Sequence, residues 1–324
     1  MNISVSIITK SKELPDIRYD NFLHSRELFS IIEQLANEKP YMFLAMNSKG
    51  RIVGHILTIL RMRHSYLPPF ATYQARIYGE GEYDDDVMKE EVFAHLLIAI
   101  TKYFNYRNCL YIEFSDLSIK MFGYKCFREN GFFPIRWMNI KNSLHSRPPK
   151  ERLNKKSINK IVYAYKHGVR TEPVADFRQL SDLYCMFKKN YKFKPLRFLP
   201  EKKFFELINK SENCTTLVSR YKGKAIGGAT IVYSKENAFL WYYAAKSKTY
   251  PLLHPGLTTI WNGISLCHKR NYKHIIFMNT GLPFKRSRFR DFILIFGGKP
   301  YSSYRWFKIN IPYLSRLSSW LFRE

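Results

Sequence analysis

The segment His254-Pro255-Gly256-Leu257-Thr258 is a candidate for binding an anion. It opens an amphipathic helix predicted over residues 255–269, and the first N–H groups of a helix have no acceptor within it. These groups and the helix dipole favour negative charge at that end. Pro255 presets the first turn, and Gly256 permits a close approach to the backbone. The alternative is an ordinary helix that begins with proline.

A basic run follows the strand predicted over residues 274–279. It reads Lys285-Arg286-Ser287-Arg288-Phe289-Arg290. On a loop that faces a cleft, Lys285 and Arg288 would bind phosphate groups of a donor, of a nucleotide-linked acceptor or of RNA. Runs of charge also occur on solvated loops that bind nothing, so both interpretations stay open.

Groups that can move protons or polarise a carbonyl are predicted at strand ends. Glu80 and Glu82 form part of an acidic stretch in an otherwise basic chain, and such carboxylates can hold or deprotonate an amine. The alternative is a solvated loop leading into a helix. Tyr243 and Asn279 lie at the ends of predicted strands, where they can polarise a carbonyl or relay a proton. Each is also a common type of core or edge residue.

Motifs for several other chemistries are missing from the sequence. The nine histidines show no His-Glu-x-x-His or other metal-ligand spacing, so we predict no metal site. There is no P-loop, no Gly-x-Ser-x-Gly elbow and no Gly-x-Gly-x-x-Gly turn. These absences argue against a kinase, a hydrolase and a dehydrogenase.

Positive charge dominates the composition. Lysine and arginine number 53 against 26 aspartate and glutamate residues, which gives a formal net charge of +27. Such an excess attracts nucleic acid, phosphorylated cofactors or an anionic membrane surface, and charge alone does not choose among them. An ordinary basic surface is the remaining alternative.

The cysteines and the hydropathy pattern indicate a compartment. The five cysteines are scattered and never form a Cys-x-x-Cys pair, as is typical of a reducing environment. No signal peptide is recognisable, and no apolar stretch approaches about 18 residues. We therefore expect a cytoplasmic protein, either soluble or peripheral on the inner face of the cell membrane.

The elements that must position these residues follow one plan twice. In each half a strand, a turn containing Lys-Gly, two more strands, a helix and a further strand succeed one another. The 324 residues suit two domains of about 100–200 residues each. Paired prolines and many charges around residues 143–157 predict a boundary, with domains 1–150 and 151–324. The predicted fold class is mixed α/β (α+β), a duplicated twisted sheet flanked by helices.

The second half resembles the C-terminal domain of FemAB-type and related GNAT-like acyltransferases. The resemblance is carried by Gly223-Lys224-Ala225-Ile226-Gly227-Gly228, the strand ending in Tyr243-Ala244-Ala245, the helix start at Pro255-Gly256 and the turn Phe296-Gly297-Gly298. The segment 153–172 looks like that family's inter-domain segment, a basic helix before a Gly-Val strand. The first half matches more weakly, through the hairpin 49–60 and the strand beginning at Ala75.

The sequence departs from the family in two places. It has no long coiled-coil arm like that of the staphylococcal Fem enzymes, which is associated with transfer RNA contacts. Related sequences often carry a lysine shortly before the Phe-Gly turn, where this chain has Phe292-Ile293-Leu294-Ile295-Phe296. That basic contact is therefore missing or is supplied by the run 285–290.

The resemblance implies a fold, an activity and a site. It implies two tandem GNAT-like domains and an enzyme that moves an acyl or aminoacyl group from acyl-CoA or aminoacyl-tRNA to an amine or hydroxyl. The acceptor would be a cell-envelope, polysaccharide or lipid-linked precursor. In GNAT proteins the donor diphosphate lies at a helix start. The implied donor-binding residues are therefore His254, Gly256, Leu257, Thr258, Lys285 and Arg288, and the implied catalytic residues are Tyr243, Asn279 and Glu80.

Two non-enzymatic alternatives stay open. The charge and the segment 155–166, rich in lysine and tyrosine, are compatible with a basic nucleic-acid-binding protein. The C-terminal segment 311–324 places Leu314, Leu317 and Trp320 on one side, so it would suit contact with an anionic membrane. Packing of that segment against the second domain is the other interpretation.

Overall fold

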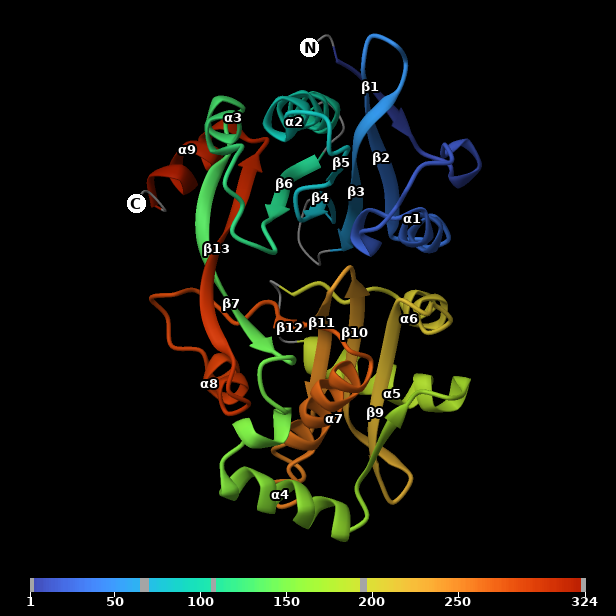
Figure 1. Cartoon of the computed structure of the whole chain (residues 1–324), viewed down its shortest axis with the longest axis vertical. Coiled ribbons are helices and arrows are strands. Elements are labelled where there is room, and N and C mark those ends of the chain that lie inside the picture. The colour runs from blue at the N-terminus through green and yellow to red at the C-terminus, as the bar shows by residue number, and fades with distance from the viewer. Residues whose placement is uncertain (1–2, 65–69, 106–108, 193–196, 322–324) are drawn as a thin grey trace. The chain divides into compact units, whose positions relative to one another are not determined.

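A computed structural model describes residues 3–64, 70–105, 109–192 and 197–321. The chain forms two compact units (Figure 1). Unit 1 consists of Met1–Trp137 together with Ser302–Glu324, and unit 2 consists of Met138–Tyr301. The C-terminal segment thus returns to unit 1 after unit 2 is complete. The sequence predicted a domain boundary between residues 150 and 151, and this boundary stays a prediction.

Unit 1 contains a mixed sheet with helices. Its strand order is β1 (Ser4–Ile8), β2 (Glu38–Met46), β3 (Ile52–His64), β4 (Ala71–Tyr78), β6 (Cys109–Ser115) and β13 (Lys299–Ile309), with the short β5 (Glu82–Tyr83) paired to β3. Its helices are α1 (Arg26–Glu33), α2 (Lys89–Asn105), α3 (Tyr124–Glu129) and α9 (Pro312–Leu321), and 3-10 turns cover Ser11–Glu13 and Phe22–His24. Strands β4 and β6 are parallel and are joined through α2, whereas the neighbouring pairs are antiparallel.

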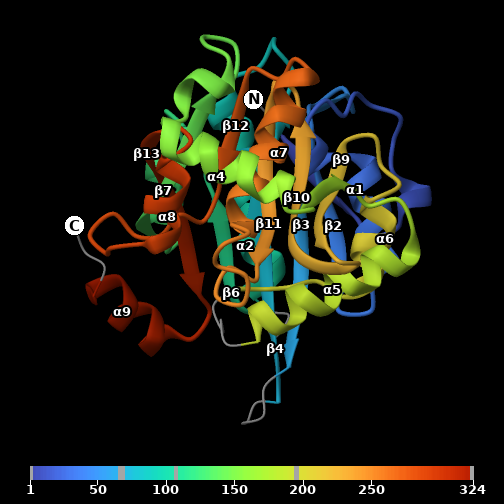
Figure 2. The same cartoon turned by 90° about the horizontal axis from the view of Figure 1, so that it is seen from below.

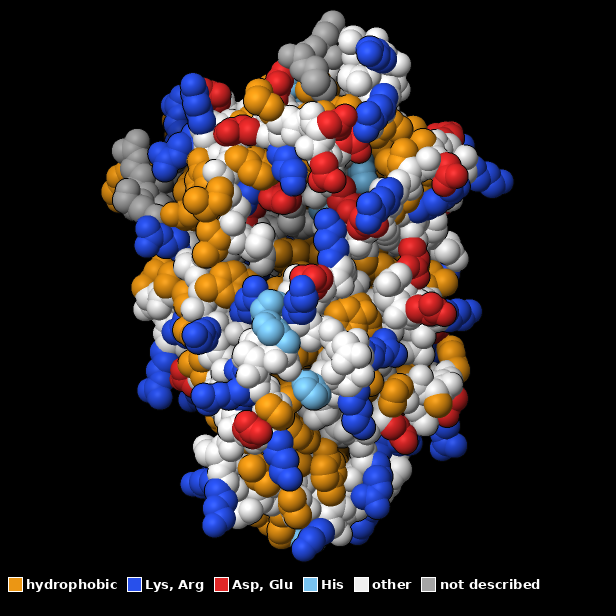
Figure 3. All heavy atoms as spheres, viewed as in Figure 1, with side chains coloured by type: hydrophobic (Ala, Val, Ile, Leu, Met, Phe, Trp, Pro, Cys, Tyr) orange, Lys and Arg blue, Asp and Glu red, His pale blue; other side chains and the backbone are white. Residues whose placement is uncertain are grey.

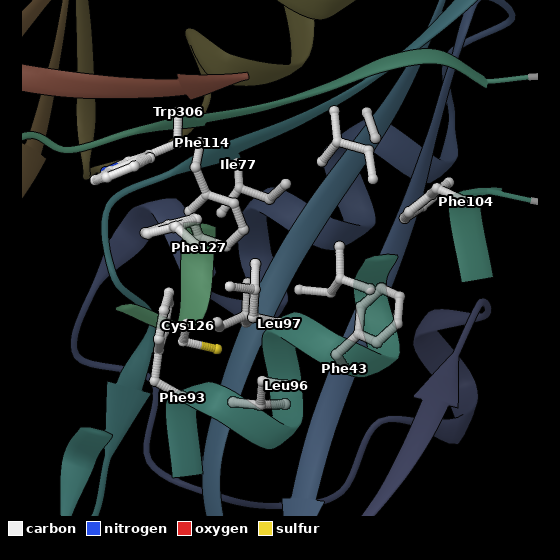
Figure 4. Close-up of a cluster of buried hydrophobic side chains, with 14 of the residues drawn as sticks. Phe43, Ile77, Phe93, Leu96, Leu97, Phe104, Phe114, Cys126, Phe127 and Trp306 are labelled. Atoms are coloured by element: carbon white, nitrogen blue, oxygen red, sulfur yellow. The ribbon is translucent and has the colours of Figure 1, made fainter. Parts of the chain in front are cut away.

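An aromatic core holds unit 1 together (Figure 4). Phe93 of α2, Phe114 of β6 and Phe127 of α3 are completely buried in it. Trp306 of β13 stacks on Phe127 with ring centroids 4.5 Å apart and an angle of 6° between the planes. Because burying a large apolar side chain contributes about 1.5–3 kcal/mol, the returning C-terminal strand is an integral part of this core.

Unit 2 repeats the plan of unit 1. Its strand order is β7 (Phe133–Ser143), β12 (His274–Phe277), β11 (Asn237–Ala245), β10 (Lys224–Ser234), β9 (Cys214–Tyr221) and β8 (Arg170–Pro173). Its helices are α4 (Lys155–Lys166), α5 (Phe177–Tyr191), α6 (Lys202–Ile208), α7 (Pro255–Lys269) and α8 (Arg288–Leu294), with a 3-10 turn at Pro149–Arg152. Strands β11 and β12 are parallel and are joined through α7, while the other pairs are antiparallel. The predicted mixed α/β fold with a repeated strand–helix–strand unit is confirmed.

Two adjacent glycines on β10 allow helices to approach both faces of the sheet of unit 2. A Cβ on Gly227 would overlap the hydroxyl of Thr259 on α7, and a Cβ on Gly228 would overlap the side chain of Leu183 on α5. Side chains alternate between the faces of a strand, so the pair serves one helix on each side. This contact explains the Ile-Gly-Gly sequence on which the resemblance partly depends.

One predicted helix differs in the structure. Helix α3 begins at Tyr124 and ends at Glu129, whereas the sequence predicted a helix from Phe127 to Gly131. Gly123, with φ of 83°, is the residue immediately before the first turn, so the helix starts earlier than predicted. Within the described part of the chain, no helix is long and apolar enough to cross a membrane.

Candidate active site

Strands β11 and β12 separate toward their carboxyl ends. Their parallel pairing joins Asn237–Leu240 to His274–Phe277 and stops there, while β11 stays paired with β10 as far as Ala245. The register between β10 and β11 shifts at Thr230/Ile231, which leaves Trp241 as an extra residue on β11. Such a β-bulge bends a strand and increases its twist. Tyr243 therefore lies beyond the point where the two strands part.

Tyr243 lies where β11, α7 and α8 meet. Its hydroxyl is so close to Gly256 that a Cβ there would overlap the Oη atom. Its ring centroid lies 5.5 Å from that of Phe289 and 6.3 Å from that of Phe292, both on α8. Burial raises the pKa of the Tyr243 hydroxyl above its ordinary value. At neutral pH the group is thus a neutral phenol, which can donate a hydrogen bond but cannot act as a base.

The start of α7 leaves one backbone N–H directed away from the helix. Pro255 has no N–H, and the N–H groups of Leu257 and Thr258 donate to the carbonyl of His254 at 2.9 and 3.1 Å. Among the described residues, no acceptor is found for the N–H of Gly256. His254, the residue before the helix, has left-handed backbone angles (φ 44°, ψ 49°). This conformation is uncommon outside glycine, asparagine and aspartate.

The other predicted donor-binding residues of α7 turn their side chains inward. Thr258 is completely buried, and its hydroxyl donates to the Pro255 carbonyl at 3.0 Å. Leu257 belongs to the hydrophobic core of unit 2. The contribution of these two residues to donor binding stays a prediction. His254 remains partly exposed, and burial, followed by the charge of Lys160, lowers the pKa of its imidazole.

The basic run forms the start of a helix as well as a loop. Sequence interpretation placed all of it on a loop, which is wrong from Arg288 onward: α8 begins there, and the Ser287 hydroxyl accepts from the Arg290 N–H at 3.3 Å. The Arg290 guanidinium donates to the carbonyls of Leu282 and Lys285, both at 2.9 Å, and thereby holds the preceding loop. Lys285 and Arg288 are exposed, so their side chains are accessible to an anion.

Asn279 lies just beyond the end of β12 and is partly buried. Its φ of 65° is in the left-handed region, which asparagine tolerates better than most residues. The next residue, Thr280, anchors the turn because its hydroxyl donates to the Met138 carbonyl at 2.6 Å. Tyr243 thus lies on β11, and Asn279 lies just after β12, the strand from which β11 parts.

Glu80 lies in unit 1, directly after β4, and is partly buried. Its backbone carbonyl accepts a hydrogen bond from the Tyr83 hydroxyl. The nearby Glu82 is engaged in structure: it accepts from the Asn21 N–H at 2.9 Å and lies 3.2 Å from His55. Glu80 thus belongs to unit 1, whereas Tyr243 and Asn279 belong to unit 2, and the role of Glu80 stays a prediction.

Sequence interpretation overlooked the aromatic side of this site. Phe289 and Phe292 pack against Tyr243, and Ser247 lies close to Gly256. The spacing of three between the two phenylalanines, after a serine that can cap a helix, was a signal for an amphipathic helix. The basic residues around them predicted phosphate binding instead.

The sequence matches no family model and no curated protein. Its structure is similar to that of FemX, with a TM-score of 0.65 and 11% identity over 98% of this chain and 100% of the FemX chain. A tandem GNAT protein from the clavulanic acid biosynthesis pathway gives a TM-score of 0.58 and 8% identity over 88% of each chain. L-PGS from Bacillus licheniformis gives a TM-score of 0.56 and 11% identity over 91% of this chain and 92% of the other.

Identities this low demonstrate a shared fold. The similarity extends over nearly the whole of this chain and of each of these structures. It also agrees with the strand–helix–strand unit that occurs once in each unit. The chain therefore has the fold of the FemAB-type and tandem GNAT-like acyltransferases, as its sequence resemblance predicted.

Proposed function

We propose that this protein is an acyl- or aminoacyltransferase whose donor binds to unit 2. The observation that carries the proposal is the position of Tyr243: a neutral hydroxyl beside the Gly256 end of α7, beyond the bulge in β11. The similar structures support it, since they include FemX and a tandem GNAT protein. Acyl-CoA and aminoacyl-tRNA are the two donor classes that we propose.

The arrangement suits acyl transfer to an amine or hydroxyl. The acceptor attacks the carbonyl carbon of the donor, negative charge develops on the carbonyl oxygen, and the CoA thiol or the tRNA hydroxyl leaves. The Gly256 N–H and the start of α7 would hold an anionic part of the donor, together with Lys285 and Arg288. Tyr243 would donate a hydrogen bond to the carbonyl oxygen, and Asn279 can supply a second. Glu80 remains our candidate for taking the proton of the acceptor.

Unit 1 is poorly suited to hold the same kind of donor. Its corresponding turn, between β4 and α2, contains Asp84, Asp85 and Asp86, and α2 itself opens with Lys89-Glu90-Glu91. Arg51 already pairs with two of these aspartates, Asp84 and Asp86. Such a concentration of carboxylates repels phosphate groups at the start of a helix. We therefore assign donor binding to unit 2.

The proposed acceptor is a cell-envelope or lipid-linked precursor, reached from the cytoplasm. Helix α9 supports contact with a membrane surface, because its apolar side chains are exposed: Leu317 to 58% and Trp320 to 67%. Arg316 on the same helix and the net charge of +27 would favour anionic lipids. The sequence predicted this membrane contact for the segment 311–324, of which residues 322–324 lie outside the described part of the chain.

The proposal is tested by measuring transfer from labelled acetyl-CoA, a long-chain acyl-CoA and charged tRNA to a panel of amines and hydroxyl compounds. We expect one donor class to be consumed by the wild type and about 100-fold more slowly by Tyr243→Phe. Tyr242→Phe is the matched control, because Tyr242 is the next residue on the same strand and packs on Phe204 and Phe205 of α6. Equal rates for the two variants, or no consumption of any donor, would contradict the proposal.

A further inference from the structure

An open pocket of about 670 Å³ lies between α4 and the segment that leads into α7. Helix α4 contributes Lys155, Lys156, Asn159, Lys160 and Tyr163 to its walls. Leu252 and His254 line the other side. Figure 2 shows α4 crossing in front of α7, and Figure 3 shows Lys and Arg side chains around exposed apolar ones at this end of unit 2. The pocket is separate from the surroundings of Tyr243, although His254 precedes α7 and therefore connects the two.

The pocket carries positive charge that acidic residues do not balance locally. Neither the segment 152–171 nor the segment 237–290 contains a single aspartate or glutamate. Within the described residues, no ion pair is found for Lys155, Lys156 or Lys160. Three ammonium groups around one pocket repel each other, and binding of an anion would relieve this repulsion.

The walls of the pocket are held in place by packing and hydrogen bonds. Asn154 caps α4 by accepting from the Ser157 N–H at 2.8 Å. The Asn262 side chain on α7 donates to the Tyr165 hydroxyl on α4, and Ala164 is completely buried. The lysines are therefore presented from a fixed helix, so little ordering is needed when a ligand binds.

An apolar surface accompanies the cations. Tyr163 is 43% exposed and stacks on His167 with ring centroids 3.8 Å apart. Leu252 is also exposed. A tyrosine ring beside lysines can stack on a flat heterocycle while the ammonium groups bind its phosphate. A nucleotide with a phosphate group combines both features.

We propose that the α4 pocket is a phosphate-binding subsite for a nucleotide-type ligand. The group that binds is a phosphate, which is either the 3′-phosphate of a coenzyme A ester or a backbone phosphate of an RNA. The inference rests on the proposed function in one respect: the ligand is the donor, a second anionic part of which reaches the start of α7 past His254. Phosphate binding itself requires no turnover and is measured without an acceptor.

The test compares affinities for coenzyme A, dephospho-coenzyme A and a short RNA by titration calorimetry. The variants are Lys155→Gln/Lys160→Gln and, as a matched control, Lys166→Gln, which changes an exposed lysine of α4 outside the pocket. We expect the wild type and Lys166→Gln to bind coenzyme A about tenfold more tightly than dephospho-coenzyme A. The double variant should lose this preference and keep its melting temperature, because the substituted side chains lie at the surface.

Other results of the titrations lead to different conclusions about the subsite. If the double variant weakens RNA binding more than Lys166→Gln does, and coenzyme A does not bind, the subsite is supported with RNA as the phosphate source. If both sets of variants weaken binding alike, or neither does, the subsite is rejected. A Tyr243→Phe protein should bind phosphate normally yet transfer slowly. Absence of transfer by the wild type, with intact phosphate binding, would reject the proposed function and leave the subsite standing.

Discussion

The hydroxyl of Tyr243 occupies the space that a side chain on residue 256 would need, so β11 and the start of α7 pack together only because residue 256 is glycine. This contact puts a hydrogen-bond donor beside the one N–H at the start of α7 that the described backbone leaves without an acceptor. It also couples a proposed catalytic residue to the packing of unit 2. The coupling can be measured separately from any activity.

Gly256→Ala should destabilise unit 2 by about 1–3 kcal/mol, because the new methyl group overlaps the Tyr243 hydroxyl. Combining it with Tyr243→Phe removes that oxygen and should recover at least about 0.5 kcal/mol in a double-mutant cycle. The measurement is urea unfolding of the four proteins. Gly263→Ala, on the same helix but facing Ile231, is the control and should be additive with Tyr243→Phe. Additive effects for Gly256 would show that the two residues do not interact.

The loss of transfer in Tyr243→Phe should be constant between about pH 6 and pH 9. Burial raises the pKa of this hydroxyl above the ordinary value of about 10, so it stays protonated over that range and its role as a donor does not change. The measurement is the ratio of wild-type to variant rate across the range. A ratio that grows with pH would indicate that the ionised form is the active one.

Trp306→Ala should destabilise unit 1 by about 3–5 kcal/mol, because the ring is buried and stacks on Phe127. A chain that ends before residue 302 should be still less stable, since it also removes one of the two strands that pair with β6. Thermal unfolding measures both effects. Trp320→Ala in α9 is the matched control: its side chain is exposed, and a change within about 0.5 kcal/mol is expected.

Unit 1 should lose stability in acid through Glu113. Burial raises the pKa of this carboxyl, but Arg76 and Arg305 lower it more, so its folded pKa lies below the ordinary value. The stabilisation is therefore complete above the unfolded pKa, near 4.5, and is lost as the pH falls through the folded pKa. Glu113→Gln should unfold more easily at neutral pH and show a weaker dependence on acid.

Urea unfolding between about pH 3 and pH 7 measures this dependence, and Glu236→Gln is the control because its pair with Lys273 is exposed. The control should keep the wild-type profile. If Glu113→Gln kept it too, other carboxyl groups would be responsible for the loss of stability in acid.

Leu317→Ser/Trp320→Ser should weaken binding to vesicles that contain anionic lipid, because it removes exposed apolar side chains from α9 without changing the charge. Co-sedimentation with vesicles of neutral and anionic composition provides the measurement. Phe284→Ser, which removes an exposed phenylalanine elsewhere, is the control and should bind like the wild type. Equal binding by all three proteins would remove α9 from the proposed membrane contact.

Sequence by itself determined the plan of this protein where the signals are local. The period of apolar residues and the turn chemistry predicted the repeated strand–helix–strand units, and the Gly227-Gly228 pair carried part of the resemblance that predicted the fold. Pro255 and Gly256 likewise marked the helix start to which Tyr243 packs. These features depend on residues that are neighbours in the sequence, so they can be predicted without knowledge of the fold.

The tertiary structure alone decided which side chains face the site. Nothing in the sequence separated Thr258 from Gly256, but the Thr258 hydroxyl donates to the Pro255 carbonyl within the helix, whereas no acceptor is found for the Gly256 N–H among the described residues. Lys160 and His254 are far apart in the chain, and only the packing of α4 on α7 brings them to one pocket. The placement of Trp306 in the core of unit 1 depends in the same way on the return of β13. Contacts of this kind join segments that are distant in sequence, and no local pattern of residue types encodes which of them will meet.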